Sequence, residues 1–255
     1  MTFTELGRTD GKTLMLLPGT CCDWQTNFGT VIPYLSEKYH LVCVNYDGFD
    51  GGDGVFPDMI TVTEKIEKYV MNKHNGHIDG AIGSSLGASF VGQLIQRRKI
   101  HMDHGIFGSP DLDQCGKFAA WLQSKLVVPF LTGCTKNEKR KRKTKEKLKR
   151  FFSMNDETAD KFMKCFAKFS PESIKNEYYT DLLTYLEEDI EVEHTKVHFI
   201  YANKMGEKYL KRYKRYFRNP DIREFDMQHE QWVFGGEEYA RPVLAAIDEF
   251  MNMPT

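Results

Sequence analysis

Short apolar runs recur along this chain, and each one ends at glycine, proline or aspartate before a segment with helical periodicity begins. Runs of four to six apolar residues between such residues are typical of strands that are buried on both faces. The predicted strands are Thr13–Leu17, Leu41–Asn45, Ile78–Ile82, His104–Phe107, Val197–Tyr201 and Ile222–Phe225, with Phe3–Leu6 as a candidate edge strand.

The segments between these runs carry apolar residues at helical spacing. The predicted helices are Phe28–Tyr39, Thr61–Met71, Leu86–Arg98, Glu207–Phe217 and Glu237–Met251. Alternation of strand and helix predicts the α/β class, with a mostly parallel sheet of about six to seven strands and helices on both faces.

Roughly 90 residues separate the fourth and fifth predicted core strands, which is too long for a bare loop. Their pattern is helical and rich in aromatic residues. We therefore expect residues 111–196 to form a helical lid inserted over the sheet, while residues 1–110 and 197–255 form the core. The aromatic residues suggest a mostly apolar pocket for a small-molecule acyl substrate.

A basic stretch, Lys136–Arg150, lies inside the predicted lid. It holds ten lysines and arginines against two glutamates, so its net charge is +8 while the rest of the chain carries −9. Such a run can bind nucleic acid or an anionic membrane, but no nucleic-acid-binding motif accompanies it. We expect a solvated helix or loop without a nucleic-acid partner, and the sequence leaves the oligomeric state open.

The composition excludes several classes of protein. With 41% hydrophobic and 13% aromatic residues, the chain can bury a core and is not disordered throughout. No run approaches the ~18 apolar residues of a membrane span, and the first residues show no secretory signal. The cysteines form no C-x-x-C pair, and no histidine pair stands nearby at ligand spacing, so we expect reduced thiols in a cytoplasm and no metal.

The sharpest signal is Gly83-Ser-Ser-Leu-Gly87, which matches G-x-S-x-G directly after a predicted strand and before a predicted helix. A serine on so tight a turn projects its hydroxyl above the sheet, and the two glycines allow close backbone approach. Leu86 then offers its N–H at a helix N-terminus, where an oxyanion is favoured. We predict that Ser85 is a nucleophile. The rival Ser84 does not fit the motif, because only Ser85 has a glycine two positions away on each side.

A serine nucleophile needs a base, and His229 is the best placed of the eight histidines. It follows the last predicted strand and precedes the final helix, where the chain order serine, acid, histidine puts the base. The second oxyanion donor is expected in the loop after the first core strand, where Gly19 lets the backbone turn. Either Thr20 or Cys21 is expected to present that N–H.

Together these residues resemble the α/β-hydrolase superfamily over nearly the whole chain. The resemblance rests on Leu16–Gly19 in the oxyanion loop, Asn45–Gly48 after the next strand, Gly83–Gly87 at the nucleophile elbow and His229-Glu near the end. It extends to the lidded branch, in which a helical cap is inserted between sheet strands six and seven of the usual count. It implies a Ser-His-acid triad and acyl-transfer chemistry, and no metal or organic cofactor is required.

The acid is the point at which the chain departs from that pattern. Lidded hydrolases usually carry an aspartate in a turn like Y-G-x-x-D, but the residues here are Tyr201-Ala-Asn-Lys-Met205. Glu207 has the length to reach back, and Asp111 occupies the other place where this fold sometimes puts its acid. We favour Glu207, keep Asp111 as the alternative, and allow that no acid acts.

These residues imply a carboxylesterase-like serine hydrolase that cleaves an ester or thioester through an acyl-enzyme. An acyltransferase on the same triad is one alternative, because only the exclusion of water by the lid would differ. The second alternative is a non-catalytic ligand-binding protein on a hydrolase scaffold, because the turn that usually carries the acid is altered here.

Overall fold

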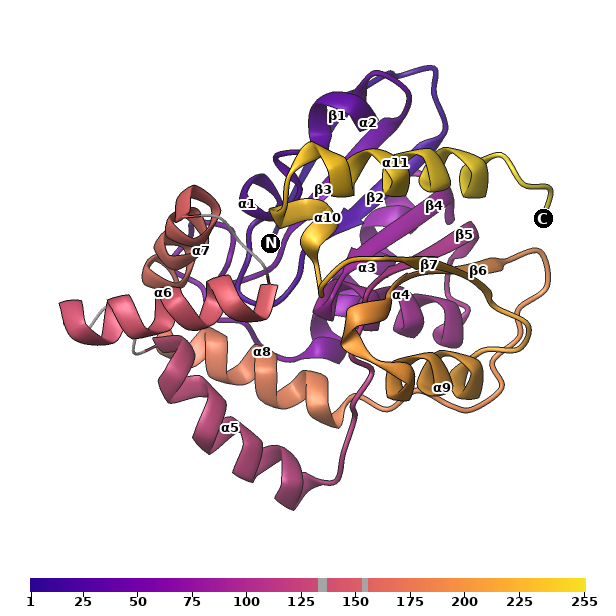
Figure 1. Cartoon of the computed structure of the whole chain (residues 1–255). Helices are drawn as coiled ribbons and strands as arrows, with labels where there is room; N and C mark the ends of the chain where they lie inside the picture. The colour runs from indigo at the N-terminus through magenta and orange to yellow at the C-terminus, as the bar shows by residue number, and fades with distance from the viewer. Residues whose placement is uncertain (133–136, 153–155) are drawn as a thin grey trace.

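A seven-stranded sheet lies at the centre of the computed structural model, which describes residues 1–132, 137–152 and 156–255 (Figure 1). Its strands are β1 (Thr2–Gly7), β2 (Thr13–Leu17), β3 (His40–Asn45), β4 (His77–Ser84), β5 (His101–Gly108), β6 (Lys196–Ala202) and β7 (Asp221–Phe225). Their order is β1-β3-β2-β4-β5-β6-β7, and neighbours are parallel except the edge strand β1, which is antiparallel to β3. The predicted α/β sheet of six to seven strands is confirmed.

Helices alternate with the strands. They are α1 (Trp24–Phe28), α2 (Ile32–Ser36), α3 (Met59–Lys73), α4 (Leu86–Arg97), α5 (Lys117–Thr132), α6 (Glu138–Phe152), α7 (Asp156–Lys168), α8 (Pro171–Leu183), α9 (Glu207–Tyr216), α10 (Gln231–Phe234) and α11 (Glu237–Met251). Strand glycines allow the helices to pack closely on opposite faces of the sheet. A Cβ added at Gly105 would lie 2.5 Å from Ile95 of α4, and one added at Gly80 would lie 2.6 Å from Met251 of α11.

The predicted helix Phe28–Tyr39 is wrong in its extent, because the structure forms two short helices there instead. The side chain of Asp23 accepts a hydrogen bond from the Thr26 N–H and starts α1 early, and α1 ends before Gly29. Pro33 lies in the first turn of α2, where its missing N–H is tolerated. In one continuous helix, that proline would remove a backbone hydrogen bond and clash with the preceding turn.

The register of the parallel strands positions the site. Leu17 pairs with Gly83, and Ser84 pairs with Gly108, so β2, β4 and β5 end side by side. Loops that follow the carboxyl ends of neighbouring parallel strands meet at one edge of a sheet, where open α/β folds bind their ligands.

Helices α5 to α8 come between β5 and β6, and Figure 1 shows them gathered beside one end of the sheet. They lie within the predicted insertion 111–196. Cys134 and Lys136, which belong to this segment, lie outside the described residues. In the part of the chain that the structure describes, no helix combines the length and the apolar character needed to cross a membrane.

Candidate active site

Ser85 lies at the tight turn between β4 and α4, in a backbone conformation that non-glycine residues rarely adopt. Its φ is 48° and its ψ is −113°, a strained combination of the kind found at functional turns. Glycine is required at both flanking positions, because a side chain there would clash with neighbouring backbone. A Cβ at Gly83 would lie 2.2 Å from the carbonyl carbon of Gly87, and one at Gly87 would lie 2.0 Å from the Leu17 oxygen.

The side chain of His229 meets that serine from the other end of the chain. Its Nε2 lies 3.1 Å from the Ser85 Oγ, within hydrogen-bonding distance. His229 lies in the loop between β7 and α10. Burial lowers the pKa of His229 below 6.5, although the charge of Asp111 and a hydrogen bond with the backbone of Ser109 act in the opposite direction. The imidazole is therefore neutral near pH 7 and able to take a proton.

The two candidate acids occupy different environments. Asp111 follows β5 and lines the same cavity as Ser85 and His229. The turn that carries it is anchored by Arg212, which donates to the Asp111 carbonyl oxygen at 2.6 Å. Glu207 is an exposed residue at the start of α9 and is not among the cavity-lining residues. Asp111, but not Glu207, therefore shares the cavity with His229 and acts electrostatically on its imidazole.

Two of the three predicted oxyanion residues remain candidates for that role. Leu86 is the first residue of α4, so its N–H has no acceptor within the helix. Thr20 lines the cavity beside Ser85. The Cys21 N–H, in contrast, donates to Glu177 Oε2 at 2.9 Å, so the structure favours Thr20 over Cys21 as the second donor.

Hydrogen bonds from two sides fix the loop that carries Thr20. The Gly19 N–H donates to Asn27 Oδ1 at 2.6 Å, and the Tyr46 hydroxyl donates to the Pro18 carbonyl oxygen at 3.0 Å. Helix α8 holds the loop from the other side through Glu177. A donor loop tied at several points is preorganised and need not rearrange as charge develops.

Glu230 is a buried carboxyl next to His229 that the sequence analysis did not assign. It adopts a left-handed conformation with φ 56° and accepts a hydrogen bond from the Ser84 hydroxyl. Burial raises its pKa to about 8, although hydrogen bonds from Ser84 and from the backbone of Ser85 lower it. Glu230 therefore links the histidine loop to the back of the elbow. The sequence signal that could have identified Glu230 is its position directly after the predicted base, His229.

A cavity of about 540 Å³ opens above the Ser85 and His229 pair. Most of its apolar residues come from the helices inserted between β5 and β6, namely Val127, Phe130, Leu131, Leu148 and Phe166, and Met205 and Phe234 add to them. Ser84 and Ser85 of the elbow and His229 and Glu230 of the histidine loop add polar groups to its lining. Such a division suits a ligand with an apolar body and a single polar reactive group.

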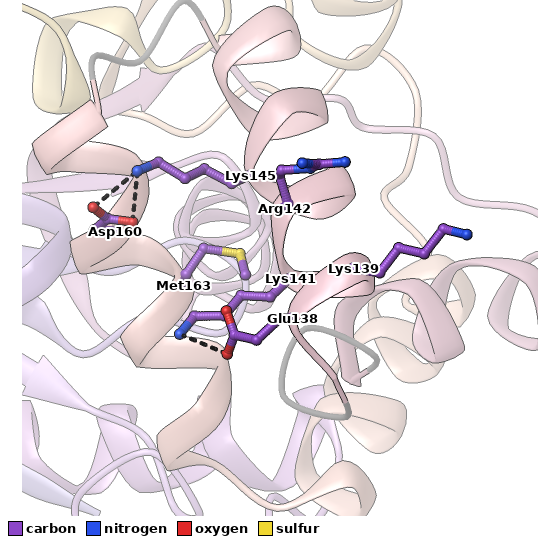
Figure 2. A pocket seen from close by; sticks show the side chains of 7 residues that line it. All are labelled: Glu138, Lys139, Lys141, Arg142, Lys145, Asp160 and Met163. Carbon is purple, nitrogen blue, oxygen red and sulfur yellow. Dashed lines mark hydrogen bonds and ion pairs between the residues drawn. The ribbon is translucent and has the colours of Figure 1, made fainter.

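From Glu138 onward the basic stretch belongs to α6 and is mostly exposed. Figure 2 shows a hollow between α6 and α7 in which Lys145 reaches Asp160 and Lys141 reaches Glu138, around Met163. Neither Ser85 nor His229 lines this hollow. The expectation that the stretch has no nucleic-acid partner stays a prediction.

No protein-family model matches this chain, and a search of curated proteins finds no match either. Solved structures match it over nearly the full length. An α/β-hydrolase family protein from Desulfitobacterium hafniense is 17% identical and has a TM-score of 0.67, with 98% of this chain and 100% of that chain covered. MenH from S. aureus is 14% identical and has a TM-score of 0.71, with 98% of each chain covered.

The type II thioesterase BorB, from the borrelidin biosynthetic cluster, is a third similar structure. It is 14% identical and has a TM-score of 0.67, with 98% of this chain and 97% of that chain covered. At this level of identity the likeness concerns the fold. The chain therefore has the α/β-hydrolase fold, as the resemblance in sequence implied.

Proposed function

We propose that this protein is a serine hydrolase that cleaves an ester or thioester through an acyl-enzyme. The observation that carries the proposal is the 3.1 Å approach of Ser85 Oγ to His229 Nε2 at a strained strand-to-helix turn. Esterases, carboxylesterases and a type II thioesterase among the similar structures support a hydrolase.

The mechanism follows from the positions of the groups. His229 takes the proton of the Ser85 hydroxyl as the oxygen attacks the acyl carbon, and the N–H groups of Leu86 and Thr20 receive the developing oxyanion. The imidazolium then gives the proton to the leaving alcohol or thiol. Water, deprotonated by His229, attacks the acyl-enzyme and regenerates Ser85. Asp111 is the acid that orients the imidazole and stabilises its charged form.

The inserted helices act as the lid in this proposal. They supply the apolar residues of the cavity, so the acyl group lies against α5 to α7 while its carbonyl group points to the elbow. A cavity of about 540 Å³ holds an acyl group of drug-like size, since ligand pockets span roughly 300–1,000 Å³.

A fluorophosphonate probe and a panel of p-nitrophenyl esters of increasing chain length test the proposal. Wild type should be labelled and should turn over at least one ester. Ser85→Ala should lose labelling and at least about 10³-fold in kcat, because the nucleophile is gone. Ser36→Ala is the matched control, since Ser36 is partly exposed and does not line the cavity, and its hydroxyl donates to the nearby Pro33 carbonyl oxygen at 3.2 Å. A folded wild type that is neither labelled nor active would contradict the proposal.

A further inference from the structure

Three side chains with metal-binding atoms converge at the amino ends of β4 and β5, on the edge of the sheet opposite the proposed catalytic cavity. His77 and His101 are the first residues of these two strands and pair directly in the register. Asp103 lies two residues beyond His101, so the pleat puts it on the same face. One nitrogen of each ring and one carboxylate oxygen all lie within 4.8 Å of one another.

We propose that His77, His101 and Asp103 form a binding site for a late divalent transition-metal ion, with Zn²⁺ as the preferred ion. This site is independent of the proposed hydrolase function. The length of β4 puts it about 25 Å from Ser85, at 3.3 Å per residue.

The two printed distances between ligand atoms are close to the edge length of a coordination tetrahedron. His77 Nε2 lies 2.9 Å and His101 Nε2 lies 3.2 Å from the same Asp103 oxygen, Oδ1. Ligand atoms that bind tetrahedral zinc at about 2.0–2.1 Å are about 3.3 Å apart. Two of the three edges thus lie within about 0.4 Å of the tetrahedral value, and the third, between the two imidazole nitrogens, is no longer than 4.8 Å.

The backbone holds the ligands in advance. The His101 N–H donates to the Gly76 carbonyl oxygen at 2.8 Å, and the His77 N–H donates to the His74 carbonyl oxygen at 3.0 Å. The two imidazole rings are stacked, with centroids 5.5 Å apart and planes inclined by 15°. The strand backbone and the ring stacking thus limit the conformational freedom that the ligands lose when the ion binds, which favours affinity.

The chemistry of the donors selects the ion. Two imidazoles and one carboxylate suit Zn²⁺, Co²⁺ and Ni²⁺, whereas Mg²⁺ and Ca²⁺ prefer sets of oxygen ligands. The half-exposed rings, 48% for His77 and 40% for His101, leave room for water at the remaining position. Spacing along the chain does not show this set, because the two histidines are 24 positions apart in the sequence and only the sheet register brings them together.

The test uses full-length protein without a polyhistidine tag, stripped with a chelator and dialysed. Zn²⁺ is titrated in competition with a chromophoric indicator, and Co²⁺ is followed by its visible absorption. Wild type should bind one equivalent of either ion, with a Co²⁺ spectrum typical of nitrogen and oxygen ligands in tetrahedral geometry, and an excess of Mg²⁺ should not displace it. Zn²⁺ should also raise the Tm, because it binds the folded chain.

His101→Ala and Asp103→Asn should each weaken Zn²⁺ binding at least about tenfold, since even an outer-shell partner is worth 10–100-fold. The matched control is His194→Ala, because His194 is an exposed histidine 3.3 Å from a carboxylate, that of Glu193, without a third ligand. Asp103→Asn keeps the shape of the side chain, and the metal-free Tm reports whether each variant folds. Absence of binding to wild type, or equal binding by wild type and both folded variants, would overturn the site.

Discussion

The carboxylate of Asp111 and that of Glu207 differ in their surroundings, and the difference predicts which one acts. Asp111 lines the cavity with His229, and its charge raises the pKa of the imidazole, whereas Glu207 is exposed. We expect Asp111→Asn to lower kcat by about 10²- to 10⁴-fold, because the imidazolium loses its stabilising charge. Ester hydrolysis at saturating substrate measures the effect.

Glu207→Gln is the control for that substitution and should retain near wild-type kcat. A large loss in Glu207→Gln together with normal activity in Asp111→Asn would assign the acid to Glu207 after all. Equal activity of both variants and wild type would mean that His229 works without an acid.

The pH dependence of the reaction is fixed by the protonation state of His229. The imidazole must be neutral to act as a base, and burial lowers its pKa below 6.5. We expect kcat/KM to rise with pH along a limb whose midpoint lies below pH 6.5. In Asp111→Asn the midpoint should move to still lower pH, because the charge that raises the pKa of His229 is removed. A midpoint above 6.5 in wild type would contradict the burial argument.

Single residues differ in how far the sequence could predict them. Ser85 and His229 were within reach because a local motif and the order of elements assign them. The contact between Cys21 and Glu177 was not, because it joins residues 156 positions apart and depends on how α8 packs. Glu230 was missed for a similar reason. Its role depends on the hydrogen bond that it accepts from the buried Ser84 hydroxyl, which is far away in the sequence.

At the scale of elements, the elbow depends on glycines that no other residue can replace without movement. Gly87→Ala would put a methyl group 2.0 Å from the Leu17 oxygen, so β2 and α4 would have to separate. We expect a loss of about 3 kcal/mol or more in the free energy of unfolding, which lowers the Tm by at least about 6 °C for a chain of this size. Calorimetry or thermal circular dichroism measures it.

Gly116→Ala is the matched control, because a Cβ at Gly116 meets nothing within 4 Å. This substitution should change the free energy of unfolding by less than about 1 kcal/mol. If Gly87→Ala were as stable as Gly116→Ala, the close approach of β2 to α4 would be incorrect.

The strands were easier to predict than the connections, for a physical reason. A buried parallel strand must be apolar over its length, so its central residues are visible in the sequence. Its first residues can be polar, and the prediction therefore missed the starts of β4 and β5, including His77 and His101. The split of Phe28–Tyr39 into α1 and α2 was missed because Asp23 and Pro33 outweigh the apolar spacing.

At the scale of the whole molecule, several carboxyl groups lie away from solvent, and burial favours their neutral, protonated form. Burial raises the pKa of each well above that of an exposed carboxyl: Glu177 to about 8, Glu230 to about 8 and Asp181 to about 7. The folded chain therefore keeps protons that the unfolded chain has lost. Such a contribution is complete below the unfolded pKa of about 4 and is lost as pH rises through the folded pKa.

Four histidines change the free energy of unfolding in the opposite direction, over a lower range of pH. Burial lowers the pKa of His74, His104, His198 and His229 below 6.5. Their contribution to stability is present above pH 6.5 and is lost as pH falls through their folded pKa values. Below pH 6.5 the histidines and the buried carboxyls offset one another. Above pH 6.5 the carboxyls continue to titrate, and the amino terminus, whose pKa is raised from 8.0 by Asp47 and Asp50, acts in the same direction from about pH 8 upward.

We therefore expect the free energy of unfolding to fall between pH 6.5 and pH 8, by up to about 1.4 kcal/mol per pH unit for each carboxyl that stays protonated. Urea denaturation at the two pH values measures the change. Glu177→Gln should show a smaller fall, because one titrating group is gone while an amide oxygen can still accept the Cys21 N–H. Glu188→Gln should behave like wild type, since the hydrogen bond from Arg215 lowers the pKa of Glu188 and its titration ends far below pH 6.5. A wild type whose stability is constant or rises over this interval would show that these carboxyls are ionised in the folded protein.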